Sequence, residues 1–153
     1  MKKLYFIAGS QDLYGEAVLR QVAKDAKDIA DFLNGQLAPA VGVEYAATVR
    51  DSDEAEDVLV KASADKDCVG VICWMHTFSP AKMWIRGLQA LKKPLLHLHT
   101  QHNEKLPYET IDMDFMNLNQ SAHGDREFGF ICTRLGVKRE VVVGYYKHPE
   151  TVE

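Results

Sequence analysis

Short apolar runs alternate along this chain with longer stretches in which apolar residues recur every three or four positions. A short apolar run predicts a strand, whereas a period of three to four predicts an amphipathic helix. This alternation is typical of parallel strands that are joined by crossover helices. The predicted strands comprise residues 3–8, 43–49, 68–75, 95–100 and 141–146.

Two helices are predicted between the first three strands. Residues 16–34 place apolar side chains on one face, and Asn34-Gly35 predicts the end of this helix. The acidic run at residues 51–54 predicts the start of a second helix, because carboxylates stabilise the positive end of the helix dipole.

The second half of the chain continues the alternation. Ser79-Pro80 predicts a helix start, since a hydroxyl caps well and proline suits the first turn, and residues 92–94 end this helix. Residues 115–135 form a long helical pattern in which Gly124 is the expected position of any break. Residues 148–153 resemble the start of one more helix.

The order of elements predicts an α/β fold, namely a three-layer, flavodoxin-like parallel sheet of about five strands with helices on both faces. Residues 68–75 are nearly all apolar, which is typical of a strand buried on both faces. No linker, repeat or low-complexity segment divides the sequence, so residues 1–153 are expected to form a single domain.

Composition narrows the class of protein. The 153 residues carry a formal net charge of −4, which gives no general attraction for nucleic acid or a membrane surface. No apolar run approaches the ~20 residues that cross a membrane, and the apolar start is too short for a signal peptide. An odd number of cysteines cannot all pair within one chain, so Cys68, Cys73 and Cys132 are expected to be reduced, buried thiols. A cytoplasmic globular domain is therefore expected.

Candidate binding residues lie where the predicted strands end. In open parallel sheets, ligands bind at the carboxyl ends of the strands, near the point where strand order reverses. The segments at this edge are rich in neutral amides, hydroxyls, imidazoles and aromatic rings. Such groups suit a neutral polyhydroxylated ligand, whose hydroxyls donate and accept hydrogen bonds. The segments comprise residues 9–15, 76–80, 100–103 and 114–123.

Other ligand classes fit these loops less well. Residues 9–15 lack both the Lys-Ser/Thr pair of a phosphate-binding loop and a G-x-G-x-x-G motif. Met75-His76 stands where a phospho-accepting receiver domain needs an aspartate. Flavin binding through the first loop is an alternative, since helix N-termini attract phosphate.

Three histidines cluster around the fourth predicted strand. His97 and His99 project from the same face of this strand, and His102 follows closely. Two imidazoles on one face suit a metal site, but no carboxylate has comparable spacing, and the nearest is that of Glu104. We therefore expect these histidines to be hydrogen-bonded inside or at the edge of the sheet.

Three further groups of residues leave alternatives open. Gln120 and His123 are three apart and share a helical face, so a ligand role competes with a structural one. Trp84 favours core packing, with an oligomer contact as the rival interpretation. Asp112 and Asp114 favour a helix start over a catalytic carboxylate pair.

Several segments together resemble the amino-terminal domain of the L-arabinose isomerase family. The first contains the motif GSQDLYG and the second contains WMHTFSPAKMW. The third reads KPLLHLHTQ, and the fourth begins with IDMDFMNLNQSAHG. The resemblance extends from the first strand to Tyr146, and residues 24–66 are its least distinctive part. The matching segments are residues 9–15, 71–85, 93–101 and 111–130.

The resemblance implies an intramolecular oxidoreductase of arabinose catabolism that interconverts L-arabinose and L-ribulose, and also D-galactose and D-tagatose. It implies a divalent metal, usually Mn(2+), held by two glutamates and two histidines in later domains. No metal ligand and no catalytic residue is therefore expected in this chain, which should be inactive alone. Family members are homo-oligomers, commonly hexamers, in which this domain reaches over a neighbouring subunit's metal centre.

The resemblance also implies that this domain forms the rim of the sugar pocket. Two short segments would line the pocket, one aromatic ring would form an apolar wall, and two polar side chains would bind sugar hydroxyls. Asp12 replaces a non-acidic residue of some relatives. The alternative function is a non-catalytic sugar-binding or subunit-interaction module with the same fold. The implied substrate-binding residues are Gln11, Leu13, Tyr14, Phe78, Gln120 and His123.

Overall fold

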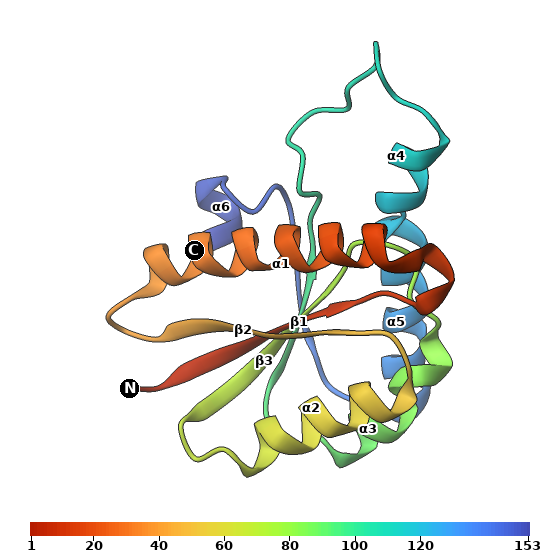
Figure 1. Ribbon diagram of the computed structural model, residues 1–153. Coiled ribbons are helices and arrows are strands. Elements are labelled where there is room, and N and C mark those ends of the chain that lie inside the picture. Colours follow the sequence, from red (N-terminus) through yellow and green to blue (C-terminus); the bar gives the residue numbers. More distant parts are fainter.

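The computed structural model describes residues 1–153 and has a central parallel sheet between two layers of helices (Figure 1). Its strand order is β2-β1-β3-β4-β5, and every neighbouring pair is parallel. The predicted fold class is thus confirmed. The strands are β1 (Lys3–Gly9), β2 (Gly42–Val49), β3 (Cys68–Met75), β4 (Leu95–His99) and β5 (Glu140–Val143).

Alternating side chains of the strands build two cores, one on each face of the sheet. Phe6, Ile72 and Trp74 pack on one face beneath α1 (Gly15–Leu37), together with the C-terminal segment that contains α6 (Pro149–Val152). The other face is covered by helices that bury Tyr5 and Cys73, among others. These helices are α2 (Ser52–Ala64), α3 (Ile85–Ala90) and α5 (Ser121–Leu135).

The segment between β4 and α5 leaves the layered core. It projects beyond the carboxyl edge of the sheet and contains α4 (Met113–Leu118) (Figure 1). Asp112 caps α4, since its Oδ1 accepts a hydrogen bond of 2.8 Å from the backbone N–H of Phe115. The predicted helix-start role of Asp112 is confirmed.

The predicted end of the first helix at Asn34-Gly35 is wrong, because α1 continues to Leu37. The Asn34 side chain does not stop the helix but accepts a hydrogen bond of 2.9 Å from the backbone N–H of Val43 in β2. The helix ends where Ala38 becomes extended before Pro39, a conformation that a following proline favours.

The long helix predicted over residues 115–135 is two helices, with the break at Asn119 and Gln120 rather than at Gly124. Gly124 lies inside α5, where it packs closely against the end of β3. An added Cβ there would lie 2.8 Å from Met75 Cβ and 2.9 Å from the Thr77 carbonyl oxygen. The absence of a side chain at Gly124 therefore lets α5 lie close to the end of β3.

Ser79-Pro80 does not start a regular helix as predicted. A 3-10 turn over Ala81–Trp84 comes first, and α3 begins only at Ile85. Ser79 makes no cap hydrogen bond, because its Oγ instead accepts one of 3.0 Å from the indole N–H of Trp84. That ring is fully buried and stacks edge-on against Phe128, so core packing is the correct interpretation of the tryptophan.

The three cysteines confirm the expected buried thiols. Cys68, Cys73 and Cys132 are free and lie in the core on the face covered by α2, α3 and α5. Burial raises the pKa of Cys73 and of Cys132, which keeps both thiols protonated and poorly reactive. None of the helices is long and apolar enough to cross a membrane.

Gly124→Ala should lower the free energy of unfolding by about 1–3 kcal/mol, because the new methyl group meets Met75 and the backbone of Thr77. Gly35→Ala is the matched control in α1, where an added Cβ has no neighbour within 4 Å. This control should raise stability by about 0.5–1 kcal/mol. Urea unfolding followed by circular dichroism measures both changes, and equal effects of the two would contradict the close approach.

Candidate functional site

The carboxyl ends of β1 and β3 meet at the point where strand order reverses. Gly9, the last residue of β1, lies beside Met75, the last residue of β3. The hydroxyls of Ser10 and Thr77, one residue and two residues further on, form a buried hydrogen bond of 2.8 Å. This bond joins the loops that follow the two strands, which is the expected location of a ligand in an open parallel sheet.

A buried carboxylate of α1 holds the first histidine of this edge. His76 follows β3 directly, and its Nε2 lies 2.8 Å from Asp25 Oδ2. Gln21 donates a hydrogen bond of 2.8 Å to the other oxygen of Asp25. Burial alone would raise the pKa of Asp25, but His76 and His102 outweigh it and lower this pKa below its usual value. Asp25 is therefore an ionised group that fixes the His76 ring.

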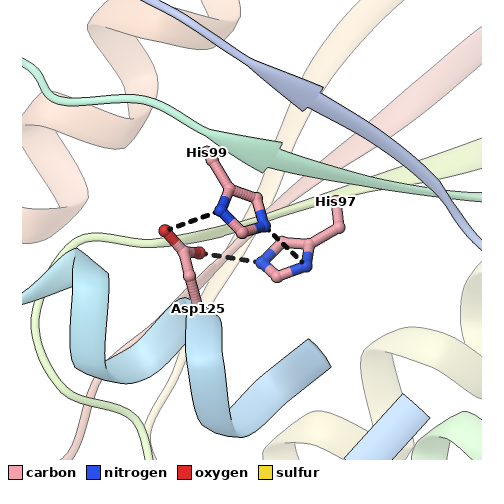
Figure 2. A group of neighbouring side chains, drawn as sticks. All are labelled: His97, His99 and Asp125. Atoms are coloured by element: carbon pink, nitrogen blue, oxygen red, sulfur yellow. Dashed lines mark hydrogen bonds and ion pairs between the residues drawn. The ribbon is translucent and has the colours of Figure 1, made fainter. Parts of the chain in front are cut away.

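The two histidines of β4 share a second buried carboxylate, Asp125 of α5 (Figure 2). His97 Nε2 lies 2.8 Å from Asp125 Oδ1, and His99 Nδ1 lies 3.7 Å from Asp125 Oδ2. The remaining ring nitrogens, His97 Nδ1 and His99 Nε2, are 3.1 Å apart. The expected hydrogen bonding of His97 and His99 within the sheet is confirmed.

These three contacts close a ring of side chains, in which the contacts of 2.8 Å and 3.1 Å are hydrogen bonds and the contact of 3.7 Å is too long for one. An ionised carboxylate and two neutral imidazoles hold the two protons that these hydrogen bonds need. Burial favours the uncharged form of each of the three groups, because it raises the pKa of Asp125 and lowers that of both His97 and His99. The guanidinium of Arg139 lowers the pKa of His97 further.

A cavity of about 380 Å³ opens beside this ring, between the ends of β4 and β5 and the first turn of α5. Its volume is within the range of small-molecule sites. His99 and Asp125 of the ring face this cavity, and Glu104 is another ionisable residue in its wall. The lining residues are His99, Thr100, Gln101, Asn103, Glu104, Ser121, Ala122, Asp125, Val143, Gly144 and Tyr145.

The residues implied by the resemblance all lie on segments at the carboxyl edge, but outside this cavity. Gln11 precedes the 3-10 turn Asp12–Tyr14, in which Leu13 is 84% exposed. Phe78 is half-buried in the loop after β3. No side-chain hydrogen bond joins any of the six to another, and only backbone hydrogen bonds link Tyr14 to Gln11 and His123 to Gln120. Their common role at a sugar stays a prediction.

The two polar residues of this set lie at the start of α5. Gln120 directly precedes the helix and donates a hydrogen bond of 3.1 Å to Asn117 Oδ1. His123, in the first turn, is exposed. Its backbone N–H donates to the carbonyl oxygen of Gln120, which keeps the two residues one turn apart.

Sequence reasoning missed both buried carboxylates. Asp25 and Asp125 lie inside helices, far along the chain from the histidines that they contact. One feature could have identified Asp25, because it falls on the apolar stripe of α1, between Val22 and Ile29. An acidic residue at an inward helical position needs a buried partner, and histidine is a suitable one.

Two groups of side chains in this chain have donors suited to a metal ion. One comprises His97, His99 and Asp125, and the other comprises Asp25, Asp28 and His102. Neither contains a glutamate, so neither fits the two glutamates and two histidines that the resemblance implies for manganese.

Comparisons with known proteins show the family of this chain. The family described as the L-arabinose isomerase N-terminal domain matches residues 1–153. A protein from Bifidobacterium animalis subsp. lactis, named L-arabinose isomerase, is 58% identical over 152 residues, covering 99% of this chain and 30% of that protein.

A second relative with the same name, from Bacteroides thetaiotaomicron, is 56% identical over 150 residues, which are 98% of this chain and 30% of the relative. The chain thus spans about 30% of the length of these curated relatives. Since the family match extends over every residue, the chain belongs to the L-arabinose isomerase N-terminal domain family.

Proposed function

We propose that this chain is the substrate-rim and oligomerisation part of an L-arabinose isomerase, which interconverts L-arabinose and L-ribulose and also acts on D-galactose to give D-tagatose. The observation that carries the proposal is the family match over all 153 residues, together with relatives of that name at 55–58% identity. Hydrogen moves between the first two carbons of the sugar in such a reaction, without loss of atoms.

The chemistry of the six rim residues supports a sugar as the ligand. Gln11, Gln120 and His123 offer neutral donors and acceptors, which match hydroxyl groups. Leu13 and Phe78 offer apolar surface for the C–H face of the sugar, and Leu13 is strongly exposed in the isolated domain.

The manganese of the family is proposed to lie outside this chain. The donor groups present here, a His-His-Asp set and an Asp-Asp-His set, differ from the implied ligands. The role of this domain is then to hold the sugar in place rather than to move its protons. When the sugar is bound and oriented, its translational and rotational entropy is lost at the binding step and need not be lost again during the reaction.

A homo-oligomer, commonly a hexamer, is proposed for the full-length protein in the cytoplasm, with neither nucleic acid nor membrane as a partner. The segment that projects between β4 and α5 supports this proposal. Its apolar side chains Leu106, Tyr108, Met113 and Met116 are all exposed. A protruding group of apolar side chains is typical of a surface that another subunit covers.

The purified 153-residue chain, given manganese and L-arabinose, should form no L-ribulose. The full-length relative from Bifidobacterium animalis, assayed in parallel, serves as the positive control. Turnover by the 153-residue chain that disappears on chelation of the metal would overturn the proposed division of labour between this domain and the rest of the protein.

His123→Ala should weaken sugar binding by about 1–3 kcal/mol, because hydrogen bonds to the sugar are lost. The variant is placed in a chimera in which this chain replaces the matching part of the Bifidobacterium relative. KM for L-arabinose should rise while manganese content stays constant. His148→Ala, which removes another exposed histidine, is the control and should leave both unchanged. A loss of manganese from the first variant would show that the assigned role is wrong.

Phe78→Ala in the same chimera should raise KM by an amount equivalent to about 1 kcal/mol, since a half-buried ring offers part of the apolar surface of a fully buried one. Metal titration and thermal unfolding of the chimera test whether the substitution changes metal affinity or stability, and both should change less than KM. An unchanged KM would remove Phe78 from the proposed rim.

A further inference from the structure

We propose that His97, His99 and Asp125 form a binding site for a divalent ion of the zinc class, separate from the sugar rim. The three side chains come from β4 and from α5, and they converge on one point beside the cavity (Figure 2). One ligand atom from each lies within 4.8 Å of the others. This site does not depend on the sugar proposal.

The spacing of the donors is close to that of a metal centre. Zinc binds imidazole nitrogen and carboxylate oxygen at about 2.0–2.2 Å, so tetrahedral ligands are roughly 3.3–3.6 Å apart. His97 Nε2 and Asp125 Oδ1 are 2.8 Å apart, and His99 Nδ1 is 3.7 Å from Asp125 Oδ2. The two distances that involve Asp125 are therefore close to those between zinc ligands, and the donor atoms of all three residues lie within 4.8 Å of one another.

Two of the three donors are already fixed in place. The His97 ring is fully buried and packs edge-on against Phe128, at 4.8 Å between ring centroids. Asp125 is buried in the first half of α5, close to Gly124, which lets this helix contact β3. Donors that are held by strand and helix packing lose little freedom when an ion binds.

The third donor gives access to the ion. The side chain of His99 is 30% exposed and lines the cavity. Both imidazoles must offer a lone pair to the ion, so the contact between His97 Nδ1 and His99 Nε2 has to open. His99 is the ring that is free to turn, and the cavity leaves room for a water molecule as fourth ligand.

The donor set selects the class of ion. Two imidazoles and one carboxylate suit zinc and neighbouring transition metals, whereas calcium takes six to eight oxygen ligands. The other donor group, Asp25, Asp28 and His102, is less available. Asp25 is held by His76 and Gln21, and Asp28 forms an ion pair of 2.9 Å with Lys24.

Calorimetric titration of the metal-stripped 153-residue chain with Zn²⁺ tests the site. We expect one tight equivalent, and we expect Co²⁺ in its place to give the visible absorption of a four-coordinate ion. His99→Gln and Asp125→Asn should each weaken zinc binding at least tenfold and abolish the cobalt spectrum. His102→Gln, from the other donor group, is the matched control and should bind like the parent chain.

Circular dichroism of each variant establishes that it is folded before titration, and His99→Gln is the decisive variant because its side chain is partly exposed. Absence of tight zinc binding by the parent chain would overturn the site. So would a loss of binding on His102→Gln as large as that on His99→Gln. The zinc titration contains no sugar, so its result is independent of the sugar proposal. Added L-arabinose should leave it unchanged.

Discussion

The tight packing around the carboxyl end of β3 is the constraint on which the rest of this edge depends. β3 is buried from Gly70 to Met75 and lies between β1 and β4. Gly9 in β1 and Gly124 in α5 both approach Met75 more closely than a residue with a Cβ would allow. This packing sets the depth at which α5 begins, and thereby the positions of Gln120, His123 and Asp125.

Two buried carboxylates connect the helical layers to this edge, one on each face of the sheet. Asp25 reaches from α1 to His76, and Asp125 reaches from α5 to the histidines of β4. The two carboxylates differ in their pKa shifts, because neighbouring histidines outweigh burial and lower the pKa of Asp25, whereas burial raises the pKa of Asp125. Such buried hydrogen bonds favour one packing arrangement, since a slip would leave the carboxylate without its partner.

The carboxyl edge of the sheet therefore combines buried, hydrogen-bonded side chains with exposed ones. Ser10, Thr77, His76 and His97 are buried and fixed by hydrogen bonds. Leu13 and His123 stand above them in solvent, as does the apolar segment between β4 and α5. The curated relatives are more than three times as long as this chain, so their sequences extend well beyond the part that matches this domain.

The sequence by itself determined the element order, the parallel sheet and the edge at which polar loops gather. Periodicity and helix capping depend on residues within one turn or one strand, so β3 could be predicted correctly at both ends. It also carried the family motifs, whose residues were correctly placed on the edge. The tertiary structure alone decided the extension of α1 beyond Gly35, the position of the break before α5 and the partners of the histidines. These features arise from contacts between segments far apart in sequence, such as Gly124 with Met75 and Asp125 with His97, and no local pattern encodes such distances.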